Sequence, residues 1–388
     1  MTVRTMDLIY LDHAATTPVR PEVLEAMLPY FSDRFGNPSS IHAFGRQTRI
    51  AISRARDTIA ACLNCSPSEF VFTGGGTESD NMALFGVAAA YGKDKKHIVT
   101  TRIEHHAVLR ACERLERQGY DVTYVPVDAN GRVKVDEIER ALRPDTFLIS
   151  VMFGNNEVGT LQPIEEIGRL ARERNILFHV DAVQALGLMP LDLTALPVDL
   201  MSFSSHKIYG PKGTGGLYIS RKISLAPLIV GGSQERNRRA GTENVAGIVG
   251  FAEAVRLAVE HRESHAREME TLRREMIRQL DRELGPSGYV VNGHPTEHLP
   301  HILNVSFPGA DTETLLMNMD MEGIAASSGS ACSSGSLETS HVLRAMELPE
   351  VVTRSAVRFS FGTGNRIEQI GETVRKLSTI LQKIRHIR

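Results

Sequence analysis

Between residues 70 and 220, short apolar segments alternate with helix-like segments, and this alternation limits the possible folds more than any other feature of the chain. The apolar segments consist almost entirely of hydrophobic residues, many of them β-branched or aromatic. This composition is typical of strands that are buried on both faces of a sheet. They are FVFT (70–73), HIVTT (97–101), VTYVPV (122–127), FLISVMF (147–153), ILFHV (176–180), LMSFS (200–204) and GLYIS (216–220). Helical patterns lie between them, as at 135–142 and 163–174. We therefore expect an α/β fold with a mainly parallel seven-stranded sheet flanked by helices.

The pattern changes after about residue 245. Residues 251–284 predict one or two long helices with an apolar residue at every fourth position from Leu272 to Leu284. Beyond them, 301–307 and 357–361 are typical strands of a smaller α+β C-terminal domain. A chain of 388 residues is long enough for two or three domains. We expect a large domain at 16–258, and a small domain formed by 1–15 together with 259–388.

Composition excludes several classes of protein. The net charge of −2 gives no basic field for nucleic acid or a membrane surface. No stretch has the ~20 apolar residues of a membrane helix, and the first residues lack the apolar core of a signal peptide. Four cysteines are too few for a disulfide scaffold, so we expect a reducing cytoplasm. Cys62 and Cys65 form a CxxC pair, which we interpret as a helix end rather than a metal or redox site, and we expect no metal.

Two candidate catalytic residues follow neighbouring strands. Asp181 follows the strand at 176–180, and Lys207 follows the strand at 200–204. Ligands of parallel sheets bind beyond the carboxyl ends of the strands, so both side chains would meet there. The glycines after Lys207 lack the order of a phosphate-binding P-loop. The alternative is a lysine that forms a Schiff base with a carbonyl compound.

A third segment, FTGGGTESDN (72–81), runs from a strand through three glycines into a predicted helix. Free backbone N–H groups at such a helix start can hold a phosphate. The lysine, the aspartate and this phosphate cradle together match pyridoxal phosphate. That cofactor needs an amine for its aldehyde carbon, a carboxylate for its ring nitrogen and a site for its phosphate.

One cysteine, Cys332, lies in SSGSACSSGS (327–336), a segment that cannot pack a core. Small residues anchor a loop weakly, so this thiol is predicted to be mobile. The alternative interpretation is a flexible linker with an incidental cysteine.

The sequence resembles the cysteine desulfurases of the NifS/IscS group, which belong to the class V aminotransferase-like branch of fold-type I pyridoxal-phosphate enzymes. The resemblance covers about residues 8–380. It is carried by YLDHAATTP, FGNPSSIH, TGGGTESDN, EHHAV, NNEVGTLQPI, HVDAVQALG, SFSSHKIYGPKGTGGLYI, RRAGTENV, GIAASSGSACSSGSLETSHVLRAM and VRFSFG. The serine-rich loop with its cysteine is the most specific of these motifs, because it separates desulfurases from aminotransferases.

The resemblance implies a role for each matching residue. Lys207 would bind the cofactor covalently and act as the base at Cα of the substrate, while Asp181 would pair with the ring nitrogen and His105 would stack on the ring. Hydrogen bonds to the cofactor would come from Asn156 and Gln184. The phosphate would be held by Gly76, Thr77, Ser204 and His206, and by Thr242 of a partner subunit, which implies a homodimer. The substrate would be held by Arg358, Asn37 and Asn156. A surface arginine is the alternative for Arg358.

The implied reaction removes sulfur from L-cysteine, giving L-alanine and a persulfide on Cys332. We expect the cofactor site, through His105 or Lys207, to help ionise this thiol. The sulfur would then pass to an acceptor protein such as an iron–sulfur scaffold. A pyridoxal-phosphate aminotransferase or lyase acting on other amino acids, including selenocysteine, is the nearest alternative and would not need Cys332. A non-enzymatic scaffold that binds iron–sulfur clusters through the four cysteines is an alternative from another class.

Overall fold

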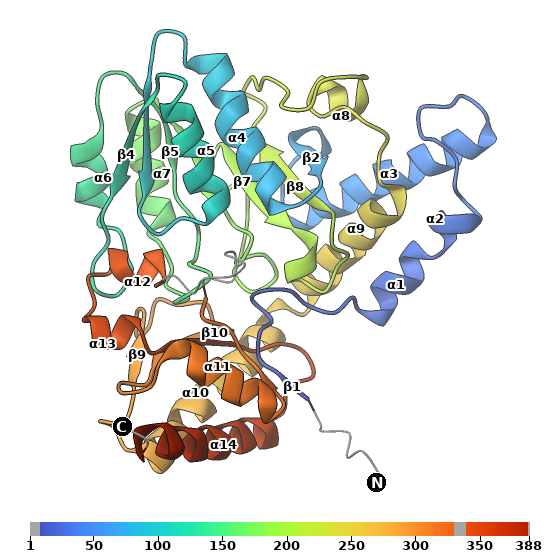
Figure 1. Ribbon diagram of the computed structural model, residues 1–388. Coiled ribbons are helices and arrows are strands. Elements are labelled where there is room, and N and C mark those ends of the chain that lie inside the picture. Colours follow the sequence, from blue (N-terminus) through green and yellow to red (C-terminus); the bar gives the residue numbers. More distant parts are fainter. Residues whose placement is uncertain (1–7, 330–338, 387–388) are drawn as a thin grey trace.

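The strands form three sheets in the part of the chain that the computed structural model describes, residues 8–329 and 339–386 (Figure 1). The strands are β1 (Ile9–Tyr10), β2 (Phe70–Thr73), β3 (His97–Thr101), β4 (Asp121–Val125), β5 (Thr146–Ser150), β6 (Leu177–Asp181), β7 (Leu200–Ser204), β8 (Gly215–Ile219), β9 (Val290–Asn292), β10 (Ile302–Ser306), β11 (Ile324–Ala325) and β12 (Ala356–Ser360). The α-helices are α1 (Pro21–Met27), α2 (Pro29–Ser32), α3 (Ala43–Cys62), α4 (Gly76–Tyr91), α5 (His106–Glu116), α6 (Val135–Ala141), α7 (Ile164–Glu173), α8 (Gln234–Asn237), α9 (Val245–Glu260), α10 (Arg262–Leu284), α11 (Thr312–Met321), α12 (His341–Ala345), α13 (Glu350–Thr353) and α14 (Ile367–His386). Two short 3₁₀ turns, η1 (Pro67–Glu69) and η2 (Ser205–Lys207), complete the described structure.

The largest sheet has seven strands in the order β2-β8-β7-β6-β5-β3-β4. Its strands are parallel except β8, which pairs antiparallel with both β2 and β7. The prediction of a mainly parallel seven-stranded sheet is therefore confirmed.

Helices cover both faces of this sheet. One core joins α3, α7 and α9 to one face, where Ile59, Ile167 and Phe251 are fully buried. The other core joins α4 and α5 to the opposite face, through residues such as Leu84 and Val108. The strands are buried on both sides for this reason, and their sequences are accordingly almost continuously apolar.

A second unit is built from β12, β10 and β9 with α10, α11 and α14. The apolar stripe of α10 packs into its core together with Ile9 and Leu11 from the start of the chain. Strand β1 pairs in parallel with β11, which ties this N-terminal segment to the C-terminal part. The helical region predicted at 251–284 is divided at His261, between α9 and α10. This packing supports the division into 16–258 and 1–15 with 259–388, which stays a prediction.

The two units are joined by backbone hydrogen bonds between the segment that follows β5 and the segment that precedes β10. Leu161 donates to the carbonyl of Glu297 across 2.9 Å, and Leu299 donates to that of Gly159 across 2.8 Å. Among the described residues, no helix is both long and apolar enough to cross a membrane. In the same residues, no group of three or more His, Cys, Asp or Glu side chains is arranged to hold a metal ion.

Candidate active site

A cavity of about 370 Å³ lies beyond the carboxyl ends of β6 and β7. This is where a parallel sheet is expected to bind its ligands, and residues from both units line the cavity. The sequence-predicted site residues on its wall are Gly76, Thr77, His105, Asn156, Asp181, Gln184, Ser204, His206, Lys207 and Arg358. Segments from six parts of the sequence therefore meet at one place.

Lys207 follows β7 within the η2 turn, which directs its side chain to the end of the sheet. Its Nζ donates to the carbonyl of Ala14 across 2.6 Å and to that of Ala15 across 2.8 Å. Both carbonyls belong to the N-terminal motif YLDHAATTP. The amine is thus held in a defined position on the cavity wall.

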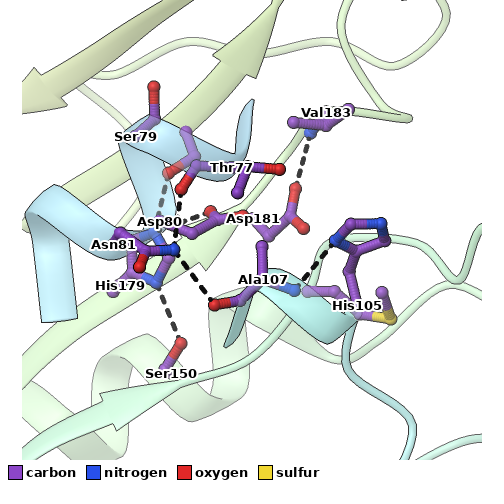
Figure 2. Close-up of polar contacts among 12 residues, drawn as sticks. Thr77, Ser79, Asp80, Asn81, His105, Ala107, Ser150, His179, Asp181 and Val183 are labelled. Atoms are coloured by element: carbon purple, nitrogen blue, oxygen red, sulfur yellow. Dashed lines mark hydrogen bonds and ion pairs between the residues drawn. The ribbon is translucent and has the colours of Figure 1, made fainter. Parts of the chain in front are cut away.

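Asp181 is the last residue of β6 and is buried (Figure 2). One carboxylate oxygen accepts a hydrogen bond from the N–H of Val183 across 3.0 Å. Burial raises the pKa of Asp181 to about 6, although the Val183 N–H and the charge of Lys207 act in the opposite direction. A buried carboxylate of this kind is stabilised by a cation, such as a protonated ring nitrogen, placed against it.

Asp80 lies one turn into α4 beside Asp181, and sequence reasoning did not single it out. Burial, followed by the neighbouring charge of Asp181, raises its pKa well above the usual range. One of its carboxyl oxygens lies 3.6 Å from Nε2 of His179. Burial lowers the pKa of His179 to about 3, and its two ring nitrogens lie 2.9 Å from the hydroxyls of Ser150 and Ser202. His179 is therefore neutral near pH 7, and the raised pKa of Asp80 favours its uncharged form beside Asp181.

The start of α4 forms the predicted phosphate cradle. Gly75 has a φ of 147°, which only glycine adopts readily, and α4 begins at Gly76 with no side chain capping it. The free N–H groups of its first turn lie next to Ser204 and His206 on the cavity wall. Gly215 of β8 passes so close that a Cβ there would lie 2.6 Å from the Cα of Gly75. The sequence shows the glycines of this cradle but not the need for Gly215.

His105 caps the N-terminus of α5, where its Nδ1 accepts a hydrogen bond from the N–H of Ala107 across 3.1 Å (Figure 2). Burial, followed by the charge of Lys207, lowers its pKa to about 4. A neutral imidazole whose Nδ1 accepts must carry its proton on Nε2. His105 is accordingly arranged to donate a hydrogen bond from Nε2 into the cavity, and its role in ionising Cys332 stays a prediction.

Arg358 is buried, with 3% of its surface exposed, so the alternative of a surface arginine is wrong. One terminal nitrogen donates to the carbonyl of Asn156 across 2.8 Å. The other pairs with Asp12 across 2.8 Å, a partner that sequence reasoning did not assign. Its Nε has no hydrogen-bond partner among the described residues. An arginine held in this way is suited to binding a carboxylate that enters the cavity.

Two of the predicted residues that the structure describes do not line this cavity. Asn37 is exposed, and its side-chain oxygen accepts from the N–H of Ser39 across 2.9 Å. Thr242 is also exposed, so its predicted role toward a partner subunit stays a prediction. Cys332 lies outside the described residues, although Gly329, three positions before it, lines the cavity.

The family model for aminotransferase class-V matches residues 9–372, nearly the whole chain. The chain belongs to the class-V aminotransferase family. A Bacillus subtilis (strain 168) relative described as putative cysteine desulfurase IscS 1 is 51% identical over 98% of this chain and 100% of its own length. Within the family, the chain belongs to the NifS/IscS group.

Solved structures agree with this grouping. A NifS-like protein superimposes with a TM-score of 0.91 at 41% identity, covering 97% of this chain and all of the other. A structure described as SspA in complex with cysteine has a TM-score of 0.80 at 39% identity, covering 91% of this chain and 98% of the other. The fold-type I architecture predicted from the sequence is therefore confirmed.

Class-V aminotransferases of this group are pyridoxal-phosphate enzymes, and the residues of the cavity fit that cofactor. The uncapped start of α4 offers N–H groups to a phosphate. Asp181 is a buried carboxylate without a full counter-charge, and Lys207 supplies the amine. The guanidinium Nε of Arg358, which has no hydrogen-bond partner among the described residues, is available to a carboxylate. The cavity is also large enough for a small cofactor and substrate together.

Proposed function

We propose that this protein is a pyridoxal-phosphate-dependent cysteine desulfurase, which removes sulfur from L-cysteine and releases L-alanine. The observation that carries the proposal is the meeting of Lys207, Asp181 and Arg358 around one cavity. The relatives described as cysteine desulfurases and the neighbour described as a complex with cysteine support this choice of substrate.

Pyridoxal phosphate, when bound, supplies an electron sink that acidifies the Cα–H bond of an amino acid joined to it. Lys207 binds the cofactor and then takes the proton from Cα at Nζ. The carbonyls of Ala14 and Ala15 hold Nζ in place, so little motion is needed for the transfer. Asp181 would pair with the ring nitrogen of the cofactor, and the raised pKa of Asp80 beside it favours placing the negative charge on Asp181.

Arg358 binds the substrate carboxylate and fixes the orientation of Cα. Its two terminal nitrogens are already held by Asp12 and Asn156, which removes rotational freedom from the guanidinium before substrate arrives. His105 offers its Nε2 proton toward the cavity that it lines. It therefore acts there as a hydrogen-bond donor to cofactor or substrate rather than as a base.

We assign the sulfur acceptor to Cys332. Its thiolate attacks the sulfur of substrate cysteine, a new S–S bond forms, and the Cβ–S bond breaks with its electron pair staying on the carbon skeleton. A proton then adds to that carbon, and alanine leaves while Cys332 holds the persulfide. The sulfur passes on to an acceptor protein, such as an iron–sulfur scaffold, in a reducing cytoplasm.

A homodimer is part of the proposal. The segment α1–α3 projects from the side of the large sheet (Figure 1) and exposes several large apolar side chains. They are Leu24, Leu28, Phe31, Phe35, Ile41, Phe44 and Ile50. A second copy of the chain seated on them would remove this patch from water. The exposed Thr242 would then reach the phosphate of the partner, as the resemblance implies.

The test is mass spectrometry of the purified protein after exposure to L-cysteine without added thiol. One extra sulfur atom is expected on the peptide that contains Cys332. Lys207→Ala is expected to lose the visible absorbance of the bound cofactor, and Cys332→Ser to keep that absorbance but form no alanine. The matched control, Cys62→Ser, changes a partly buried thiol and is expected to behave like the parent. Unchanged alanine and sulfide formation by Cys332→Ser would contradict the proposal.

A further inference from the structure

His301 lies directly before β10 and contacts Gln184 from the opposite unit of the structure. Its Nε2 is 3.2 Å from Oε1 of Gln184, and both residues are buried. The other end of the same amide, Nε2 of Gln184, donates to the carbonyl of Ala14 across 2.9 Å. Both ends of one buried amide are thus held by groups outside the large sheet.

The chemistry of these groups fixes the direction of each hydrogen bond. The carbonyl of Ala14 can only accept, so the nitrogen of the Gln184 amide faces it and the amide oxygen faces His301. That oxygen can also only accept, so His301 must carry a proton on Nε2. Burial, followed by the charges of His13, Arg358 and Lys207, lowers the pKa of His301 to about 3, so the ring is neutral. Its Nδ1 is therefore unprotonated, and it has no hydrogen-bond partner among the described residues.

The same carbonyl connects this amide to the catalytic lysine. Nζ of Lys207 donates to the carbonyl of Ala14 across 2.6 Å, so Lys207 and Gln184 share one acceptor. Gln184 also lines the cavity, and its amide nitrogen has a second hydrogen to offer there. The backbone of His301 is itself held, because its carbonyl accepts from the N–H of Phe361 across 2.9 Å.

We propose that His301 is a positioning residue of the active site. By holding the amide oxygen of Gln184, it keeps the amide nitrogen turned toward the cavity and toward the Ala14 carbonyl, which also accepts from Lys207. The inference rests on the proposed function, because the group that would accept the second hydrogen is the ring oxygen of pyridoxal phosphate. A donor at that oxygen stabilises its anion and weakens its attraction for the proton on the lysine linkage. The pKa of this linkage therefore depends on His301.

The experiment is a pH titration of the visible absorbance of the cofactor-loaded protein without substrate. In His301→Leu the amide oxygen loses its donor and the amide can turn, so the pKa of the lysine linkage is expected to rise by about 0.5–1 unit. His301→Gln places an N–H at the reach of the imidazole Nε2 and is expected to restore the parental pKa. His265→Leu is the matched control. His265 lines an adjoining cavity and lies 3.0 Å from Nη2 of Arg20, but the structure shows no hydrogen bond from it to Gln184.

The outcomes separate this inference from the proposed function. If His301→Leu titrates like the parent, or if His265→Leu shifts the pKa equally, His301 does not position Gln184. If His301→Leu does not fold, His301→Asn, whose shorter side chain cannot reach Gln184, takes its place and is expected to show the same rise. If the parent protein itself binds no cofactor and shows no visible absorbance band, the proposed function is wrong, and the inference about His301 is wrong with it.

Discussion

Arg358 donates to Asp12 across 2.8 Å, and this ion pair joins two segments that lie 346 residues apart in the sequence. A second terminal nitrogen of the guanidinium is held by the carbonyl of Asn156. Two corners of the group are therefore fixed at the cavity wall, and Nε has no partner in the described part of the chain. The pair makes the arginine rigid without using all of its donors.

Replacing Arg358 with lysine is expected to raise KM for L-cysteine more than it lowers kcat. An ammonium cannot keep the contacts with Asp12 and Asn156 and also bind a carboxylate bidentately. Losing a hydrogen bond to a charged group costs about 1.5–3 kcal/mol, so KM is expected to rise about tenfold to a hundredfold. Alanine formation measured over a range of L-cysteine concentrations gives both constants.

The control for this change is Arg354→Lys. Arg354 is largely exposed and pairs with Glu350 across 3.3 Å on the surface of α13, where an ion pair contributes little. Its kinetic constants are expected to match those of the parent. An unchanged KM in Arg358→Lys would show that the substrate carboxylate binds elsewhere.

Asp80→Asn is expected to keep the affinity for pyridoxal phosphate. Burial and the charge of Asp181 raise the pKa of Asp80 well above its usual range and favour its protonated form, so an amide of the same shape is expected to change little charge. Asp181→Asn is expected to lower the affinity at least about tenfold, because it removes the buried partner of the ring nitrogen. Absorbance titration of cofactor-free protein with pyridoxal phosphate measures both. An equal loss of affinity for pyridoxal phosphate in the two variants would mean that Asp80 also carries charge.

The sheet and the strand-end positions of Lys207 and Asp181 could be predicted because they follow from local sequence patterns. Each strand is a short apolar run, and parallel topology alone brings their carboxyl ends together. The contacts of Asp12 with Arg358 and of His301 with Gln184 could not be predicted, because no local periodicity reports which distant segments meet. In residues 357–361 the apolar side chains of Val357, Phe359 and Phe361 alternate with Arg358 and Ser360, which puts Arg358 on the opposite face of its strand. This pattern does not show that the face borders the cavity and not solvent.

His179→Gln is expected to destabilise the protein more at pH 7 than at pH 5. The pKa of His179 falls from 6.5 to about 3 on folding, so the folded chain binds fewer protons between these values. The free energy of unfolding of the parent therefore falls as pH is lowered through this window, by up to about 2 kcal/mol from this residue at pH 5. The variant lacks this titration. The difference in free energy of unfolding between the parent and the variant should therefore be smaller at pH 5 than at pH 7. Urea unfolding at both pH values checks this, and a constant difference would contradict it.

Gly215→Ala is expected to weaken cofactor binding. The added Cβ would lie 2.5 Å from the carbonyl of Phe203 and 2.6 Å from the Cα of Gly75, so backbone at the phosphate cradle must move. We expect at least about a tenfold loss of affinity, since even a small displacement disturbs N–H groups that hold a charged ligand. Gly371→Ala is the control, because it lies in helix α14 and meets only the flexible end of Arg375. An unaltered affinity in Gly215→Ala would show that the cradle does not hold the phosphate.

Changing Ile41 and Phe31 together to aspartate is expected to convert the proposed homodimer into monomers. Ile41 is 87% exposed and Phe31 63% exposed, so the change removes few contacts within one chain. Two buried charges at the centre of an apolar interface, however, would oppose association strongly. Sedimentation velocity measures the change in mass, and cofactor content should fall with it because Thr242 no longer reaches the partner. Met321→Asp, which alters a residue 74% exposed on α11, is expected to leave the dimer intact. A double variant that sediments as the parent does would place the interface on another face of the protein.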